Sequence, residues 1–314
     1  MTEPRVTVVT GASSGIGRAV AHRAAEQGDA VVLVARGRPA LEDTAAECRS
    51  AGASSTLVVP TDVRNDEAVR ACFDEVLRSR GRVDAVVHCA GVVAYGRTED
   101  IPVEVFDGVL ATNVTGSVNV ARHTISQLRR QGRGSLVLFG SVIGHIAVPT
   151  MSAYVISKWS VRALARQLQI ENRDMHDVTI AYIAPGGVNT PIYEQAANYS
   201  GFAGRPPPPV ESPERVARVA MRRLDRQRAR TQTGLANGVM RFGFNAAPWA
   251  FDLLVGPLYT LAATDRTRPV TATAGNVLHS LSANYGVHGD QRSAVVGVGR
   301  NVIARLSSLV RSTE

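Results

Sequence analysis

Tyr154 and Lys158 are the residues of this chain whose types and spacing point most directly to chemistry. Residues four apart lie on one face of a helix, so the phenol and the ammonium address one point in space. A phenol has a pKa of about 10 and is a poor acid at neutral pH, but a neighbouring cation lowers that pKa. The pair is therefore a candidate general acid and base. The alternative is a surface helix pair without a chemical role.

The composition of the chain makes this pair stand out. Lys158 is the only lysine among the 35 lysine and arginine residues. Arginine cannot replace a compact ammonium on a flexible stem without changing both its reach and its proton affinity. A chain that otherwise uses arginine thus has one lysine, four residues after a tyrosine, which favours a chemical role for it.

A glycine-rich turn near the N-terminus predicts a phosphate-binding site. It follows an apolar strand over residues 6–10 and opens a helical pattern that continues to about residue 27. In such a strand–turn–helix unit the glycines let backbone approach a pyrophosphate, and the helix N-terminus supplies N–H donors and a favourable dipole. An ordinary glycine-rich turn is the alternative. The residues expected to contact a dinucleotide here are Gly11, Ser13, Ser14, Gly15, Ile16 and Gly17.

The end of the second strand, residues 30–35, indicates which dinucleotide is bound. In NAD-binding folds an acidic residue near this point accepts a hydrogen bond from the ribose 2′-hydroxyl. Here Arg36 and Arg38 follow the strand and no carboxylate does. Because a guanidinium pairs well with a phosphate, we expect NADP(H) rather than NAD(H), with Arg36 at the 2′-phosphate. The alternative is that both arginines only begin the next helix.

Strands alternate with helical patterns along the first two thirds of the chain, which predicts an α/β fold. We expect a Rossmann-type doubly wound parallel sheet with helices on both faces and ligands at the carboxyl ends of the strands. Residues 102–130 are predicted to form two successive helices, with Asn113 inside an apolar stretch. Asparagine within a helix competes for backbone hydrogen bonds and can mark a local distortion.

Taken together, these motifs resemble the short-chain dehydrogenase/reductase family over about residues 5–230. The matching pieces, in the family's order and at its spacings, are Thr10-Gly11-x-x-x-Gly15-x-Gly17, Asp62-Val63, Ala90-Gly91, Asn113, Ser141, Tyr154-x-x-x-Lys158 and Pro185-Gly186-x-Val188-x-Thr190. The resemblance implies an oxidoreductase that interconverts a carbonyl and a secondary alcohol and assembles as a homodimer or homotetramer. The apolar lid favours a hydrophobic small-molecule substrate.

The resemblance also implies a role for each matching residue. Tyr154 protonates the substrate oxygen, and Lys158 holds the nicotinamide ribose and lowers the pKa of Tyr154. Ser141 hydrogen-bonds the substrate oxygen, while Asn113 positions a water that links Lys158 to solvent. The other implied cofactor contacts are Asp62 and Val63 at the adenine, Val188 and Thr190 at the carboxamide, and Ala90, Gly91, Pro185 and Gly186.

One position departs from the family pattern. His88 and Cys89 precede Ala90-Gly91, where the family has asparagine. That asparagine normally ties neighbouring backbone together, and a cysteine offers only a weak donor. The rigidity of this strand end is therefore in question, and the sequence assigns no role to His88.

We expect a dinucleotide-binding and catalytic domain over residues 1–234 and a mostly helical extension over residues 235–314. Within the first, residues 190–211 correspond to the family's substrate lid, and a final strand is expected near residues 230–233. In the second, residues 246–263 are apolar but contain Asp252 and two prolines, which is poor for a spanning helix. This stretch is predicted to be a subunit interface, a pocket wall or an interfacial membrane segment.

The last part of the extension divides into two segments. Residues 264–291 are predicted to be an irregular connecting arm. Residues 293–311 carry apolar side chains at near-helical spacing, with arginines between them. They predict an amphipathic helix that packs on its own chain or a partner subunit, or lies on a membrane.

The bulk properties narrow the class of protein. The chain has a net charge of +8, three cysteines without metal spacing and seven histidines without a ligand cluster, so we expect no metal site. The positive charge is spread along the chain without a recognition motif, so we expect no nucleic-acid partner. The chain begins directly with a strand and has no signal-peptide pattern, which predicts a cytoplasmic protein, either free or membrane-associated.

Two other classes of protein remain as alternatives. One is a catalytically idle NADP(H)-binding regulatory protein, although a binding module does not need all four of Asn113, Ser141, Tyr154 and Lys158. The other is a nucleotide-sugar epimerase, which the spacing of the glycine-rich turn disfavours.

Overall fold

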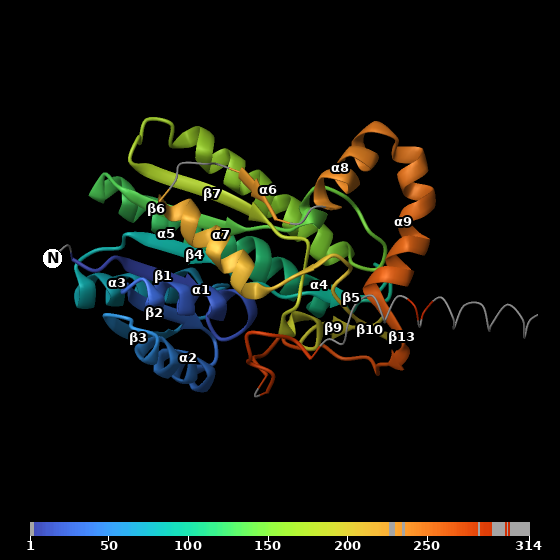
Figure 1. Ribbon diagram of the computed structural model, residues 1–314, viewed down its shortest axis with the longest axis horizontal. Helices are drawn as coiled ribbons and strands as arrows, with labels where there is room; N and C mark the ends of the chain where they lie inside the picture. The colour runs from blue at the N-terminus through green and yellow to red at the C-terminus, as the bar shows by residue number, and fades with distance from the viewer. Residues whose placement is uncertain are drawn as a thin grey trace, which may run out of the picture.

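A central sheet of seven parallel strands organises the computed structural model, which describes residues 3–225, 230–233, 236–281, 283–290, 299 and 301 (Figure 1). The predicted Rossmann-type sheet is thus confirmed, including the final strand. In spatial order the strands are β3 (Ser55–Pro60), β2 (Ala30–Ala35), β1 (Val6–Thr10), β4 (Ala85–His88), β6 (Gly134–Phe139), β7 (Val178–Ala184) and β12 (Arg230–Gln232). The inner strands β1, β2, β4, β6 and β7 are mostly apolar and buried on both faces, as expected of a parallel sheet covered by helices.

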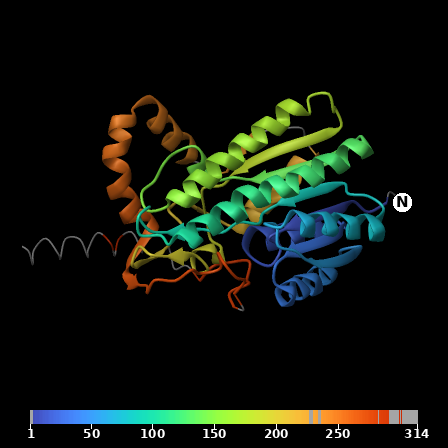
Figure 2. The same ribbon diagram turned by 180° about the vertical axis from the view of Figure 1, so that it is seen from behind.

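Helices cover both faces of the sheet (Figures 1 and 2). Each face has its own buried apolar cluster, to which alternate residues of the strands contribute. One face carries α1 (Gly15–Glu26), α2 (Arg38–Ser50) and α7 (Pro213–Asp225), and the other carries α3 (Asp66–Arg80), α5 (Gly116–Gln131) and α6 (Ser152–Glu171).

The two helices expected over residues 102–130 are present, and the distortion expected at Asn113 is confirmed. Helix α4 (Val103–Leu110) passes into a π-helical turn, η1 (Ala111–Thr115), before α5 begins. The turn places the Asn113 amide against the chain after β4, where its Oδ1 accepts from Val92 N and its Nδ2 donates to Val92 O, both at 2.9 Å. A π-turn of this kind is frequent at functional sites.

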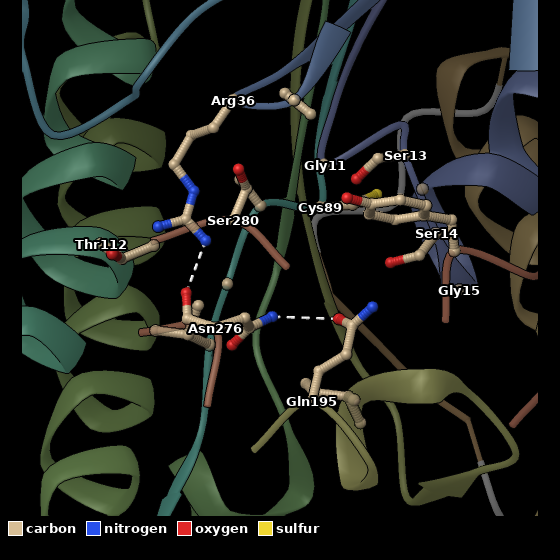
Figure 3. A pocket seen from close by; sticks show the side chains of 18 of the residues that line it. Gly11, Ser13, Ser14, Gly15, Arg36, Cys89, Thr112, Gln195, Asn276 and Ser280 are labelled. Carbon is tan, nitrogen blue, oxygen red and sulfur yellow. Dashed lines mark hydrogen bonds between the residues drawn. The ribbon is translucent and has the colours of Figure 1, made fainter. Parts of the chain in front are cut away.

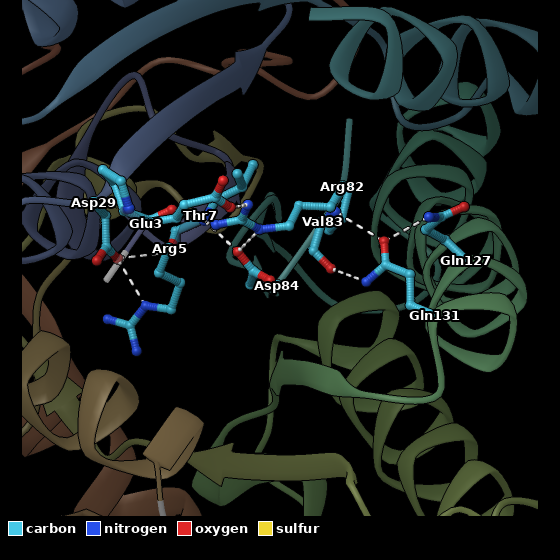
Figure 4. Close-up of polar contacts among 11 residues, drawn as sticks. Glu3, Arg5, Thr7, Asp29, Arg82, Val83, Asp84, Gln127 and Gln131 are labelled. Carbon is cyan, nitrogen blue, oxygen red and sulfur yellow. Dashed lines mark hydrogen bonds and ion pairs between the residues drawn. The ribbon is translucent and has the colours of Figure 1, made fainter. Parts of the chain in front are cut away.

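Polar side chains fix the amino ends of the central strands (Figure 4). Asp29 accepts from Arg5 Nε at 3.0 Å and from Thr7 Oγ1 at 2.7 Å, which joins β1 to the start of β2. Asp84, just before β4, accepts from Arg82 Nε at 2.9 Å. The carboxyl ends of the same strands form the opposite edge of the sheet, where both cavities described below lie.

Short paired segments shape the region that follows β7. They are β5 (Ala94–Tyr95) with β9 (Ala197–Asn198), β8 (Gly187–Val188) with β11 (Val210–Glu211), and β10 (Phe202–Gly204) with β13 (Thr264–Pro269). Two 3-10 turns, η2 (Val142–Gly144) and η3 (Pro191–Tyr193), complete it. These strand pairings and turns fix the expected substrate lid, residues 190–211, at several positions along its length.

The C-terminal extension starts with two helices that stand at the carboxyl edge of the sheet, α8 (Ala236–Ala246) and α9 (Pro248–Ala263), drawn in orange (Figure 1). The irregular arm expected over residues 264–291 is corrected in part, because it begins with strand β13, which pairs antiparallel with β10. Within the described ranges no helix is long and apolar enough to cross a membrane. The terminal helix expected over residues 293–311 lies outside the described residues, apart from residues 299 and 301.

Candidate active site

A first cavity of about 160 Å³ lies at the point where the strand order reverses, between β1 and β4 (Figure 3). In open parallel sheets this crevice is the usual place for a ligand. It collects the predicted dinucleotide contacts from five separate segments, which follow β1, β2, β3, β4 and β7. The predicted residues that line it are Gly11, Ser13, Ser14, Gly15, Ile16, Gly17, Arg36, Asp62, Val63, Ala90, Gly91 and Thr190.

The glycine-rich turn is shaped for close backbone approach. Gly11 has a φ of +68°, and a Cβ there would lie 2.8 Å from Ala90 N, so only glycine lets β1 and β4 meet this closely. A Cβ on Gly17 would lie 2.1 Å from Gly11 O. The side chain of Ser14, the residue before α1, makes no capping hydrogen bond to the helix in the described structure. The helix N-terminus thus points its N–H donors at the cavity, which fits a pyrophosphate.

Arg36 reaches into this cavity from the end of β2. Its Nη2 donates to Asn276 O at 2.6 Å (Figure 3), and its Nη1 donates to Val277 O at 3.3 Å. Burial lowers its pKa, and the charge of Arg64 lowers it further. Arg64 itself pairs with the carboxylate of Asp62, with Nη2 2.6 Å from Oδ2. Two guanidinium groups therefore lie where the adenosine end of a dinucleotide is expected.

A second, larger cavity of about 520 Å³ adjoins the first, since Gly91 and Thr190 line both. Its walls are mostly apolar side chains from the segments after β4 and β6, from the lid, and from α8 and α9. Of the roles left open for residues 246–263, that of a pocket wall is therefore found. The predicted residues that line this second cavity are Ile16, Gly91, Ser141, Tyr154, Lys158, Pro185, Gly186, Val188 and Thr190.

Tyr154, Ser141 and Lys158 all line the second cavity, and Lys158 lies beside Gly91, which lines both cavities. Ser141 is near enough to Tyr154 to favour the ionised form of its phenol. Lys158 Nζ lies 5.4 Å from the centroid of the Tyr154 ring and donates to Phe139 O at 3.1 Å. The residues sit one turn apart on α6, so both side chains reach the end of β6.

The pKa of Tyr154 is shifted upward, opposite to the lowering expected from Lys158. Burial, and then Tyr182, raise this pKa above its ordinary value, while Ser141 lowers it. Burial lowers the pKa of Lys158 to about 8. The physical reason is that the surrounding protein removes solvent from both groups, so that each favours its neutral form more than it would in water. Tyr154 therefore stays protonated and can donate a proton.

Asn113 lies behind these residues and is absent from the described linings of both cavities. Besides its contacts with Val92, its Nδ2 donates to Ser157 Oγ at 2.9 Å, and Ser157 Oγ donates to Tyr154 O at 2.8 Å. The amide thus joins the chain after β4 to the helix that carries Tyr154. A Cβ on Gly91 would lie 3.3 Å from Asn113 Oδ1 and 3.6 Å from Lys158 Nζ, so the lysine is close by.

His88 makes hydrogen bonds that connect neighbouring backbone segments, as the family's asparagine is expected to do at this strand end. Its Nδ1 lies 2.8 Å from Thr10 Oγ1, and its Nε2 lies 3.0 Å from Ser117 Oγ. Because Ser117 Oγ donates to Asn113 O at 2.6 Å, it accepts its second hydrogen bond from His88 Nε2–H. His88 Nδ1 then carries no proton and accepts from Thr10 Oγ1. Burial, and then the charge of Lys158, lower the pKa of His88 to about 3 and keep it neutral. The imidazole therefore joins β1, β4 and α5.

Three tyrosines that the sequence did not single out also line the second cavity, Tyr95 from β5, Tyr193 from the lid and Tyr259 from α9. Burial raises the pKa of all three phenols. Their hydroxyls give a mostly apolar cavity three further polar groups beside Tyr154. The only signal in the sequence is a tyrosine within the apolar run of residues 246–263, and it does not say which way the ring points. No group of three or more metal-ligating side chains occurs in the described part of the chain.

The fold and the two adjoining cavities are those of a Rossmann-type oxidoreductase. The sequence profile of the short chain dehydrogenase family matches residues 5–199, more than half of the chain. The chain therefore belongs to the short-chain dehydrogenase/reductase family, which confirms the resemblance.

Curated relatives cover the same region. A tetrahydroxynaphthalene reductase of Pyricularia oryzae is 34% identical over 193 residues, which are 61% of this chain and 67% of the relative. A 3beta-hydroxysteroid dehydrogenase of Mediterraneibacter gnavus is 32% identical over 196 residues, 62% of this chain and 70% of the relative.

Solved structures extend the likeness to the fold. An alcohol dehydrogenase from the archaeon Thermococcus sibiricus, complexed with 5-hydroxy-NADP, superposes with a TM-score of 0.64 at 30% identity, covering 74% of this chain and 96% of that one. A short chain dehydrogenase/reductase from Burkholderia phymatum, in complex with NAD, superposes with a TM-score of 0.70 at 25% identity, covering 81% and 96%.

Proposed function

We propose that this protein is an NADP(H)-dependent oxidoreductase that interconverts a carbonyl and a secondary alcohol on a hydrophobic small molecule. The observation that carries the proposal is that Tyr154, Ser141 and Lys158 together line a large apolar cavity that adjoins a glycine-lined cleft. A dinucleotide in the first cavity and a substrate in the second would face each other across these three side chains.

The chemistry follows from what the side chains can do there. The bound nicotinamide supplies or accepts the hydride. Tyr154, half-buried and protonated, donates its phenolic proton to the substrate oxygen in reduction and accepts it in oxidation. Ser141 orients that oxygen beside the phenol. Lys158 binds the ribose hydroxyls, and its charge stabilises the phenolate that forms when Tyr154 gives up its proton.

Asn113 and His88 position this centre from behind. Asn113 holds the backbone of Tyr154 through Ser157, and His88 holds the carbonyl of Asn113 through Ser117. The water that Asn113 was expected to position beside Lys158 stays a prediction.

The preference for NADP(H) is supported by charge. Arg36 lies in the cleft and Arg64 lies next to it, and no carboxylate follows β2. A guanidinium can bind a 2′-phosphate with two parallel hydrogen bonds. Of the two solved structures described above, one carries an NADP derivative and the other NAD, so the family accommodates both.

A hydrophobic substrate is supported by the second cavity, whose volume of about 520 Å³ lies within the range of about 300–1,000 Å³ that is usual for small-molecule sites. By their names, the two curated relatives act on a polyhydroxylated naphthalene and a steroid. We therefore propose a ring-containing, mostly apolar ketone or alcohol of that size, with Tyr193 and Tyr259 as further hydroxyl contacts.

The test is NADPH oxidation against a panel of apolar cyclic ketones, with Tyr154→Phe as the control variant. We expect turnover that falls by about 10²- to 10⁴-fold in the variant, while the dissociation constant for NADPH is unchanged. Tight NADPH binding without turnover of any ketone, together with a wild-type rate equal to that of the variant, would instead favour the idle regulatory protein.

The finer organisation is also proposed. We propose that residues 1–234 form the catalytic domain and residues 235–314 an extension that packs on it. A homodimer or homotetramer stays a prediction, for which light scattering on the purified protein is the test, and so does a cytoplasmic location. Peripheral membrane contact is supported by α8 and α9, where Phe242, Trp249 and Leu253 are 75%, 76% and 71% exposed.

A further inference from the structure

The segment after β13 runs over the first cavity and touches both of its sides. We call residues 270–281 and 283–290 the strap. At the lid side Asn276 N donates to Gln195 O at 2.8 Å, and Asn276 Nδ2 donates to Gln195 Oε1 at 3.0 Å (Figure 3). Gln195 Nε2 in turn donates to Asn284 O at 2.6 Å. A single buried glutamine thus joins two points of the strap to the lid.

The strap also covers the start of α1. Gly286 O accepts from Gly15 N at 3.0 Å, and Tyr285 O accepts from Arg18 Nη1 at 2.7 Å. The N–H groups at this helix start are the donors expected to bind a pyrophosphate. The strap therefore occupies part of the hydrogen-bonding capacity that a dinucleotide needs.

Arg36 is the contact between the strap and the adenosine end of the cleft. Its two Nη atoms donate to the carbonyls of Asn276 and Val277. A 2′-phosphate would need the same donors, since bidentate phosphate binding uses two N–H groups of one guanidinium. A phosphate placed there would also lie beside two carbonyl oxygens, which are negative dipole ends. The two sets of contacts therefore compete.

The small volume of the cleft supports an outward movement of the strap when a dinucleotide binds. The first cavity measures about 160 Å³, about half of the lower limit of about 300 Å³ that is usual for sites of drug-sized ligands. A dinucleotide is larger than such a ligand. Asn276, Ser280 and Tyr285 of the strap line the cavity, so moving the strap outward is the direct way to enlarge it.

We propose that the strap closes the cofactor cleft, that Arg36 latches it, and that a 2′-phosphate opens the latch by taking the guanidinium from the strap carbonyls. The proposal rests on the NADP(H)-binding function proposed above and adds a source of specificity to it. A cofactor without the 2′-phosphate has to open the strap against the Arg36 contacts and gains nothing from Arg36. A cofactor with it exchanges one set of Arg36 contacts for another.

The first test measures backbone amide exchange of residues 274–281 in the protein without cofactor. Arg36→Gln is compared with Arg38→Gln, because Arg38 is 60% exposed and pairs with Glu42 on the outside of α2. We expect exchange at least about tenfold faster in the first variant and unchanged in the second. Adenosine 2′-monophosphate should speed this exchange in the wild type, whereas adenosine 5′-monophosphate should not. Equal exchange in wild type and Arg36→Gln would overturn the latch.

The second test measures dissociation constants of NADH and NADPH by calorimetry. Arg36→Gln should bind NADH about tenfold more tightly than the wild type, because the charged hydrogen bonds that hold the strap are gone, and NADPH more weakly. Gln195→Ala loosens the strap and leaves Arg36 in place, so it should tighten both cofactors. Unchanged or weaker NADH binding in Arg36→Gln would refute the competition.

The two proposals fail in distinguishable ways. If neither dinucleotide binds the wild type or Gln195→Ala, the NADP(H) function is refuted, while the exchange of residues 274–281 without cofactor still reports on the latch. If NADPH binds and turns over while that exchange is the same in Arg36→Gln and Arg38→Gln, only the strap proposal is refuted.

Discussion

Replacing Lys158 by methionine should make the folded protein more stable at neutral pH while removing its activity. Burial lowers the pKa of this lysine from 10.5 to about 8. The unfolded chain holds the proton up to the higher value, so the folded state is penalised whenever the group is charged. At 1.36 kcal/mol per pKa unit, the penalty at pH 7 is about 3 kcal/mol.

The pH dependence of this penalty gives the prediction its sign. The penalty is fully present below pH 8. It decreases as the pH rises above about 8, where the folded protein loses the proton, and it is gone above 10.5, where the unfolded chain has lost the proton too. Methionine fills a similar volume without charge but loses the hydrogen bond to Phe139 O, worth about 1.5 kcal/mol. Lys158→Met should therefore be more stable than the wild type by about 1–2 kcal/mol at pH 7 and equal to it near pH 9.5.

Urea unfolding of both proteins at pH 7 and pH 9.5 measures this difference. Tyr154→Phe is the control, because its phenol titrates only near pH 10 and above and should produce no such slope. If the variant is less stable than the wild type at pH 7, or if the difference in stability does not change with pH, then burial does not destabilise the charged form of Lys158 and the reasoning is refuted. Its side chain would then lie in a wetter site than the structure shows.

Three further predictions address other parts of the molecule. His88→Leu should lower the free energy of unfolding by about 1–3 kcal/mol at pH 7 by leaving its partners unpaired. It should also reduce the loss of stability between pH 6.5 and 3, where the unfolded wild type takes up a proton that the buried imidazole refuses; urea unfolding at both pH values checks this. Arg36→Asp should weaken NADPH binding far more than NADH binding, and the exposed Arg38→Asp neither, as measured by calorimetry; equal losses would contradict the phosphate contact. Trp249→Ser should reduce co-sedimentation with anionic vesicles several-fold, and unchanged sedimentation with a smaller particle size would instead indicate an interface between copies of the chain.

The parts of the site that are local in sequence could be predicted. The glycine-rich turn needs only its own backbone conformation and the strand and helix beside it, and Tyr154 and Lys158 need only one helix. The distortion at Asn113 also follows from one residue type in one helix. These features depend on interactions over a few residues, where the sequence pattern is informative.

The long-range contacts could not be predicted. The role of His88 depends on Thr10 and Ser117, which are 78 and 29 residues away, and becomes visible only when the strand order is known. The strap holds Arg36 with two backbone carbonyls, which every residue carries, so nothing in the sequence marks these positions. The same limit explains why β13 was expected to be irregular, since its partner β10 is about sixty residues earlier in the chain.

Because of the π-helical turn at Ala111–Thr115, the number of residues in this segment determines how α4 is oriented relative to α5. An α-helix advances by about 100° per residue, so removing one residue from the turn would restore regular hydrogen bonding and rotate α4 against α5 by about that angle. The shortened helix would be sound by itself, yet Asn113 would lose either Val92 or Ser157 as a partner. Single substitutions would not reveal this dependence, because they change the type of a residue and leave the number of residues in the turn unchanged. A single in-frame codon deletion would reveal it, as a well-folded protein without turnover.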